Sequence, residues 1–445
     1  MTAPSPVVKG TPRAGLTGAT IGFFVGFAAV ALFGPTAVRF QQSMHLSAMA
    51  VGFLVAMPAL SGSLLRIPFS AWVDTTGGRK PFLVLLGLSL AGMIGVAAIV
   101  ATRYPDRLSP ELYPLLLVLG LLCGCGIATF SVGISQVAYW FPQRGQGRAL
   151  AVYAGFGNLA PGLFSLLMPM AFVSLGLAGS YLAWLVFLAL GLVAYALLGR
   201  NAWLFQLMAA GEKPDEARVH ARALGQELFP AGTTMDTLRI SAGTWQTWAL
   251  VAIYFSTFGG FVALTAWLPT YWTSAFGVTA VTAGILTAVY SLLASLIRIL
   301  GGVMADRLQQ GGSNTSVLAL LVMLSGALLM TVAGDFELAV PGEILLAVGM
   351  GLCNAAVFKM VPQVVPRAVG GAAGWVGGIG AFGGFVIPPI LAFAVRQIGP
   401  RGYAIGFIVF VFLALLSLAM TWVLKYSPSP AGYQPPAISS QQADG

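Results

Sequence analysis

The stretches LLRIPFSAWVD (64–74) and LIRILGGVMAD (296–306) carry the same pattern inside two long apolar runs. Each places an arginine, Arg66 or Arg298, eight residues before the aspartate that ends the stretch. Eight helical residues rise about 12 Å. If the two aspartates mark a membrane surface, both arginines lie near the middle of a bilayer, where a cation costs about 2.5–3.5 kcal/mol or more. Cations at that depth usually face a polar cavity and mark a substrate path.

The acidic residues offer these arginines no obvious partner. The 13 Asp and Glu fall at the ends of apolar runs, in loops or in the tail, and Glu343 is placed at the very start of a run. Lys359 is a third basic residue inside a run, so the interior is predicted to hold three cations and no clear anion. A substrate anion would supply the missing charge, and the planar guanidinium fork suits a flat oxyanion. The alternative is two structural arginines bonded to helix carbonyls, but matched positions in two halves favour a shared site.

Composition defines the class of protein. The chain has 445 residues, 58% of them hydrophobic and 8% charged, whereas soluble domains are about 25% charged. This predicts a polytopic membrane protein. The net charge of +9 is spread over short loops, which does not indicate a nucleic-acid surface. Three cysteines in apolar runs and two histidines near loops predict no disulfide, metal, cofactor or enzymatic chemistry.

Twelve apolar runs are long enough to cross a bilayer as helices. They lie near 16–38, 50–73, 81–101, 112–138, 149–173, 178–199, 247–271, 280–305, 315–334, 338–361, 371–396 and 402–424. We therefore predict an all-α membrane protein with twelve transmembrane helices in two pseudo-symmetric six-helix halves. The predicted parts are a cytoplasmic tail (1–14), an N-terminal half (15–199), a cytoplasmic central loop (200–246), a C-terminal half (247–425) and a disordered cytoplasmic tail (426–445).

Charge predicts the orientation of these runs. Of the 22 Lys and Arg, 14 fall on the side that holds both termini and five on the other side, with three inside the runs. The positive-inside rule places the 14 in the cytoplasm. The Arg–Asp pattern recurs from the first half to the second, which is the plan of a parallel-repeat secondary transporter. The turns that begin at Asp74 and Asp306 resemble the loop signature of the major facilitator superfamily, although no Arg directly follows Asp74.

Three further strings narrow the resemblance. They are GCGIATFSVGISQVAYWFPQRGQGRALAVYAGFGNLAPG (124–162), YFSTFGGFVALT (254–265) and GGAAGWVGGIGAFGGFVIPP (370–389). With LLRIPFSAWVD they resemble the NarK/NasA nitrate–nitrite porter family of the major facilitator superfamily, over almost the whole chain. The family often has Gly and Asn where this chain has Ala128 and Thr129, so the wall formed by the fourth run differs.

The resemblance implies a nitrate site between the halves. It implies that Arg66 and Arg298 hold the anion and that aromatic residues of the fourth and seventh runs pack against it. The implied binding residues are Arg66, Arg298, Tyr254, Phe258 and Phe130, with Asn158 nearby, and the signature glycines are Gly155, Gly157, Gly377, Gly380, Gly383 and Gly384.

The residues themselves fit a flat, weakly hydrated anion. Tyr254 and Phe258 lie one helical turn apart on the same face, and packing against lipid or the core is the alternative for both. Asn158 and Asn354 are amides inside apolar runs, where each needs a partner. We expect Asn354 to bond to a neighbouring helix.

Lys359 is the candidate for proton coupling. It lies about 12 Å from Arg367 along a helix, so we expect it well inside, where burial would favour the neutral amine. The alternative is a lysine that reaches back to the cytoplasmic surface.

We predict a protein of a bacterial cytoplasmic membrane, with both termini inside, that moves nitrate, and also nitrite, by alternating access. We expect nitrate and nitrite, protons and the lipid bilayer as partners, and a monomer. Nitrate–proton symport is favoured over nitrate–nitrite exchange. The alternatives are a facilitator for formate, oxalate or another small anion, a passive anion channel, and a nitrate sensor.

Overall fold

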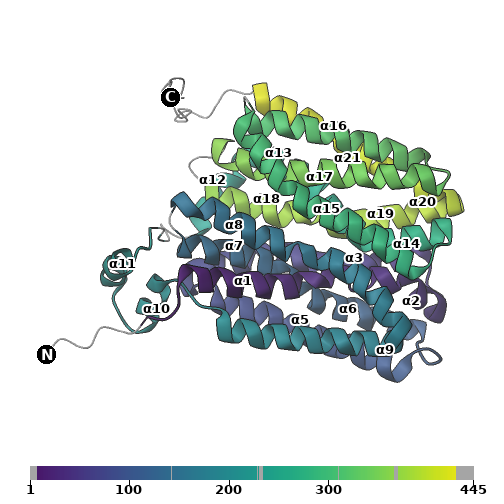
Figure 1. Ribbon diagram of the computed structural model, residues 1–445, viewed down its shortest axis with the longest axis horizontal. Coiled ribbons are helices and arrows are strands. Elements are labelled where there is room, and N and C mark those ends of the chain that lie inside the picture. Colours follow the sequence, from purple (N-terminus) through teal and green to yellow (C-terminus); the bar gives the residue numbers. More distant parts are fainter. Residues whose placement is uncertain are drawn as a thin grey trace, which may run out of the picture.

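The structure is a computed structural model that describes residues 8–141, 143–227, 229, 234–308, 310–364 and 369–426. Within that part the chain is helical and forms no β-strand. Long helices run side by side in two groups, the N-terminal one purple to teal and the C-terminal one green to yellow (Figure 1). The predicted fold class is confirmed. Apart from Tyr426, the tail predicted to be disordered lies outside the described residues.

The N-terminal half begins with a helix that Thr11 caps by accepting a hydrogen bond from the Ala14 N–H. Its elements are α1 (Pro12–Phe27), η1 (Ala28–Ala31), η2 (Gly34–Thr36), α2 (Ala37–Met44), α3 (Ala48–Leu64), α4 (Arg66–Thr76), α5 (Arg79–Arg103), η3 (Pro110–Leu112), α6 (Tyr113–Gly124), η4 (Cys125–Ala128), α7 (Thr129–Trp140), α8 (Gln143–Gly157) and α9 (Leu159–Leu198).

Three short helices follow and lead into the C-terminal half. The short helices are α10 (Trp203–Ala209), α11 (Pro214–Ala223) and α12 (Thr234–Ala242). The C-terminal half contains α13 (Trp245–Tyr254), the π-helical turn η5 (Phe255–Gly259), α14 (Gly260–Phe276), α15 (Ala280–Arg307), α16 (Gly311–Val332), α17 (Phe336–Val364), α18 (Val369–Ala381), α19 (Gly383–Ile398), η6 (Gly399–Arg401), α20 (Gly402–Ile405) and α21 (Ile408–Tyr426).

The helices cross the membrane twelve times. The described residues hold 11 segments that are long and apolar enough to span a bilayer. The longest, Val152–Leu198, has 47 residues and contains Gly176 at φ 68° and ψ 175°, which is not helical. Glycine accepts this backbone conformation because it has no Cβ. The chain turns back there, so this segment makes two of the twelve crossings.

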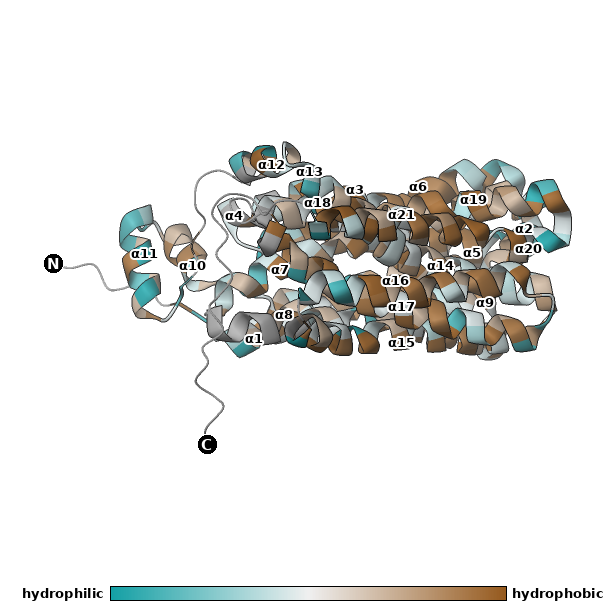
Figure 2. Cartoon of the chain, turned by 90° about the horizontal axis from the view of Figure 1, so that it is seen from above, coloured by the Kyte–Doolittle hydropathy of each residue, from teal (hydrophilic) through white to brown (hydrophobic). Residues whose placement is uncertain are grey.

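The surface of the bundle matches a lipid environment. A broad apolar band covers the long helices, and polar residues gather at the two ends (Figure 2). Large apolar side chains such as Val173 and Phe412 are exposed on this band. In water such a surface would favour aggregation, whereas lipid tails solvate it. The chain is therefore a multi-pass membrane protein.

The two halves meet along paired helices. In particular, α3 packs against α19, and α9 packs against α15. The short helices α10 and α11 lie at the end of the bundle that also holds the first described residues (Figure 1). At that end α12 packs against α18, and the indole N–H of Trp375 donates to the Leu238 carbonyl at 3.0 Å.

Candidate anion-binding site

Arg66 lies at a break in the second membrane-spanning segment. α3 ends at Leu64 and α4 begins at Arg66, because Pro68 has no N–H to donate to the carbonyl one turn earlier. The side chain is 1% exposed. Its Nε donates to the Gly62 carbonyl at 3.1 Å and its Nη1 to the Gly377 carbonyl at 2.9 Å. Gly377 belongs to α18, so Arg66 already joins the two halves.

The alternative of structural arginines bonded to helix carbonyls is thus partly observed, because Arg66 does make two such bonds. One nitrogen is left over, because Nη2 is buried without a hydrogen-bond partner. A buried, charged donor without a partner is costly, so this nitrogen favours an acceptor that enters the site.

Phe258 forms the wall between the two arginines. Its ring is fully buried in η5, with its centroid 5.2 Å from Cζ of Arg66 and 5.9 Å from Cζ of Arg298. π-Helical turns such as η5 are frequent at functional sites. Tyr254 stacks on Phe258 with centroids 4.8 Å apart and ring planes 3° apart. The ring of Phe130 lies 6.1 Å from Phe258 and 4.9 Å from Cζ of Arg66.

A narrow gap lies beside this wall at the boundary between the halves. It is too tight for a water molecule in this structure. Its lining residues are Asn158, Phe258, Phe261, Ala294, Ser295, Arg298 and Asn354. Arg298 is half-buried here. The hydroxyl of Ser295 donates to the Asn158 carbonyl at 3.1 Å, which is a second bond between the halves.

Several polar atoms around the wall have no hydrogen-bond partner. They are Nη2 of Arg66, Oη of Tyr254, Oδ1 of Asn158 and Oδ1 of Asn354, all buried. The hydroxyl of Tyr254 lies close to both Arg66 and Arg298. Within the described part of the chain neither arginine forms an ion pair. The site combines two cations, flat aromatic faces and unsatisfied polar groups, which suits a small, flat anion.

The structure brings together the six residues predicted for binding. Sequence reasoning missed Phe261 and Ser295, which also line the gap. Phe261 could have been found from its spacing, because it lies three residues after Phe258 on the same face of the helix. The expectation for Asn354 is wrong, because its Oδ1 lacks a partner and its side chain lines the gap.

The signature glycines allow close contacts at different places. A Cβ at Gly380 would lie 2.7 Å from Cδ1 of Tyr254, so glycine there lets α18 approach the aromatic wall. A Cβ added at Gly157 would lie against Phe23, and a Cβ added at Gly383 would lie 2.6 Å from the Phe255 carbonyl oxygen. Gly384 faces the side chain of Val262, again at 2.6 Å. Gly377 contributes its carbonyl to Arg66, whereas Gly155 has open space beside it.

Two expectations about the burial of charged groups differ from the structure. Lys359 is exposed on α17, so burial does not favour its neutral amine. Conversely, Glu343, seven residues after the first residue of α17, is 3% exposed, so the interior does hold an acidic residue. The side chains of Asp74 and Asp306 lie outside the described part, as does Arg367.

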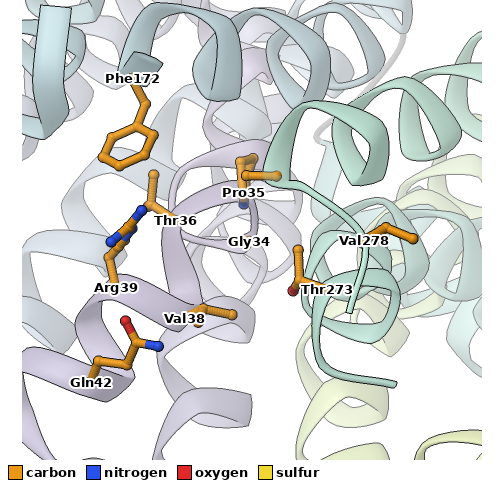
Figure 3. Close-up of a pocket in the computed structure, with 10 residues that line it drawn as sticks. Gly34, Pro35, Thr36, Val38, Arg39, Gln42, Phe172, Thr273 and Val278 are labelled. Carbon is orange, nitrogen blue, oxygen red and sulfur yellow. The ribbon is translucent and has the colours of Figure 1, made fainter. Parts of the chain in front are cut away.

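A larger cavity lies between the halves at the end away from α10 and α11. Its volume is about 290 Å³. Thr36, Arg39 and Phe172 line it from the N-terminal half, and Thr273 and Val278 from the C-terminal half (Figure 3). Cζ of Arg39 lies 4.6 Å from the centre of the Phe172 ring. The cavity therefore exposes the boundary between the halves to that face of the membrane.

The comparisons with known proteins agree with this architecture. The profile of the Major Facilitator Superfamily matches residues 19–340 and 274–442. The "Probable nitrate/nitrite antiporter NarK1" of Thermus thermophilus is 30% identical over 427 residues, 91% of this chain and 89% of that protein. The "Nitrite extrusion protein" of Bacillus subtilis is 27% identical over 401 residues, 90% of this chain and 91% of that protein.

Among solved structures, the xylose transporter XylE from E. coli, in a partially occluded inward open conformation, superimposes with a TM-score of 0.73. It is 14% identical and covers 95% of this chain and 99% of its own, so it supports the fold alone. The chain therefore belongs to the major facilitator superfamily and, within it, to the NarK/NasA nitrate–nitrite porter family.

Proposed function

We propose that this protein carries nitrate, and also nitrite, across a bacterial cytoplasmic membrane by alternating access. The observation that carries the proposal is the placement of Arg66 and Arg298, from opposite halves, beside the single ring of Phe258. A planar anion lying against that ring can accept hydrogen bonds from both guanidinium groups. Binding then pulls the halves together, and closure on one side accompanies opening on the other.

The neighbouring groups fit the same anion. Tyr254 and Asn354 place unpartnered polar atoms at the edges of the site, and Phe130 covers Arg66. The closely packed rings leave little room, which disfavours larger anions such as oxalate. The names of the Thermus and Bacillus relatives support nitrate and nitrite as the substrates.

Orientation and coupling complete the proposal. The excess of Lys and Arg on the side of the termini supports a cytoplasmic location for that end. We favour nitrate–proton symport over nitrate–nitrite exchange. The sequence suggested Lys359 as the coupling group, because burial would favour its neutral, proton-accepting amine. Lys359 is exposed, so that argument does not apply to it.

The test is uptake of labelled nitrate into proteoliposomes that contain nitrate, nitrite or neither, with and without an inward proton gradient. Saturable uptake that internal nitrate accelerates supports a carrier. Uptake that never saturates and shows no counterflow would support a channel, and binding without any flux would support a sensor. Formate or oxalate competing better than nitrite would replace the proposed substrate.

A further inference from the structure

Glu343 is a buried carboxyl group that the anion site does not use. It lies on α17, seven residues and about 10 Å along the helix from its first residue, Phe336. Its side chain is 3% exposed, and Oε1 has no hydrogen-bond partner. An ionised carboxylate in such a place is very unfavourable unless it is paired, whereas the protonated acid is neutral and far cheaper to bury.

The surroundings of Glu343 are aromatic. The groups that act on its carboxyl are the indole of Trp272 and the hydroxyls of Tyr271 and Tyr290. The Tyr290 hydroxyl already bonds to Sδ of Met350 at 3.0 Å. Oη of Tyr271 and Nε1 of Trp272 have no partner of good geometry. These two donors can turn to the carboxylate when it ionises, so the site can hold either charge state.

No described charged side chain in the packed helices neutralises Glu343. α14 contributes Tyr271 and Trp272, and α15 contributes Tyr290. The described cations of α15, Arg298 and Arg307, lie about 12 Å or more further along that helix from Tyr290. α16 and α18 contain no titratable residue, and α13 brings only Tyr254, at the level of the anion site. A proton is therefore the ligand that best matches this site. A metal ion does not fit, because the described residues form no group of three or more acidic, His or Cys ligands.

Aromatic rings separate Glu343 from the nearest end of the bundle. The ring of Trp272 lies 5.4 Å from both Phe276 and Phe336. Phe276 and Phe336 lie 6.2 Å apart, which closes the cluster. Movement of these rings would admit water from that side, and their packing in this structure excludes it.

Glu343 is also connected to the anion site. It shares a face of α17 with Asn354, because eleven residues make close to three full turns, and Asn354 lines the gap about 16 Å further along. Tyr290, which faces Glu343, stacks on Phe261 at 6.1 Å, and Phe261 also lines the gap. A negative charge on Glu343 would repel the anion, with a coupling on the order of five-fold at this separation and an effective dielectric constant of 20.

We propose that Glu343 is the proton-carrying site of this transporter. The inference rests on the proposed function, since it assigns the coupling of that same anion cycle. Hydronium on the outer side transfers a proton to a lone pair of a carboxylate oxygen, which forms an O–H bond and leaves water. The neutral acid accompanies the bound anion through the change of access, and the O–H bond then breaks as water on the cytoplasmic side takes the proton.

The test uses the full-length protein in liposomes with the membrane potential clamped. Glu343→Gln imitates the protonated acid, and Glu337→Gln, on the exposed first turn of the same helix, is the matched control. Both variants should exchange internal for external nitrate at wild-type rates. An inward proton gradient should raise nitrate accumulation at least five-fold for the wild type and for Glu337→Gln, and not at all for Glu343→Gln.

A second measurement does not depend on any variant folding. Nitrate added to the purified wild-type protein in weakly buffered alkaline solution, where Glu343 of the empty protein is ionised, should bring uptake of a proton, visible with a pH dye. Accumulation by Glu343→Gln at the wild-type level, or nitrate binding by the wild type without proton uptake, overturns the assignment. Nitrate exchange without any response to the proton gradient overturns it while leaving nitrate transport intact. Absence of nitrate exchange by the wild type instead refutes the proposed function.

Discussion

Replacing Arg66 with lysine keeps one positive charge at the centre of the molecule but removes the planar fork of donors. In the structure the guanidinium uses Nε for Gly62 and Nη1 for Gly377, and Nη2 is left for the anion. A single ammonium group cannot satisfy the Gly377 carbonyl and the anion with the same geometry. Arg66→Lys therefore sacrifices either the bond between the halves or the bond to nitrate.

The size of the effect follows from these contacts. One charge-assisted hydrogen bond contributes about 1.5–3 kcal/mol. The guanidinium also lies 4.9 Å from Phe130 and 5.2 Å from Phe258, and a desolvated cation–π contact contributes about 1–2 kcal/mol, part of which lysine retains. A total loss of about 3 kcal/mol corresponds to roughly 150-fold weaker nitrate binding. Arg298 is less buried and lies 5.9 Å from Phe258, so Arg298→Lys should weaken binding by about ten-fold.

Isothermal titration of nitrate into each purified variant gives these numbers directly. Arg401→Lys, on the exposed turn η6, is the matched control and should bind like the wild type. Thermal unfolding and gel filtration establish that each variant is folded before binding is compared. Binding by Arg66→Lys within three-fold of the wild type would show that its free donor does not serve the anion.

Three further predictions concern the anion site and the coupling group. Phe258→Ala should weaken nitrate binding and admit larger anions in a competition assay, because the shared wall of both arginines is removed; unchanged affinity and selectivity would place the anion elsewhere. Gly380→Ala should reduce nitrate uptake several-fold, because its Cβ would lie 2.7 Å from Tyr254, while Gly155→Ala, which has open space, should transport normally; equal uptake by the two would contradict this. Lys359→Gln should keep proton-driven accumulation if the coupling group is elsewhere, and its loss would restore the lysine as that group.

The sequence predicted the positions of the site residues along their helices better than the directions of their side chains around the helix axes. The repeated spacing predicted equivalent positions for Arg66 and Arg298, and both lie against the ring of Phe258. One helical turn separates Tyr254 from Phe258, and their rings stack. Those are local relations, which depend on the rise and pitch of a helix alone. The contact of Arg66 with the Gly377 carbonyl was beyond this reasoning, because it depends on how the two halves dock.

Lys359 and Glu343 show the same limit. Both lie on α17, one near each end. Distance from the helix ends indicated a buried lysine and a surface carboxylate, and the structure has the reverse. Burial of a single side chain is decided by its direction around the axis and by the neighbours it meets, here the rings of Trp272 and Tyr290 against Glu343. When a helix is apolar on most of its faces, a single sequence does not reveal the direction of one side chain around the helix axis.

The balance of forces between the empty halves bears on the mode of transport. Arg66 and Arg298 lie on the same ring of Phe258, so their Cζ atoms are at most about 11 Å apart. At an effective dielectric constant of 20 their repulsion is about 1.5 kcal/mol or more. The Arg66 bond to the Gly377 carbonyl favours closure by a similar amount, about 1.5–3 kcal/mol. Closure of the empty carrier is then close to neutral.

A strict exchanger requires the empty carrier to be trapped, whereas a symporter must return without its anion. The repulsion between the arginines and the Arg66–Gly377 hydrogen bond are of similar size and oppose each other. Net uptake into nitrate-free liposomes should therefore be no more than about ten-fold slower than exchange with internal nitrate. Repulsion of about 1.5 kcal/mol or more, if unopposed, would slow the return of the empty carrier by about 13-fold or more. Both rates can be measured on one preparation with labelled nitrate. Net uptake slower than exchange by a thousand-fold would mean that the repulsion dominates, and exchange would then be the natural mode of this protein.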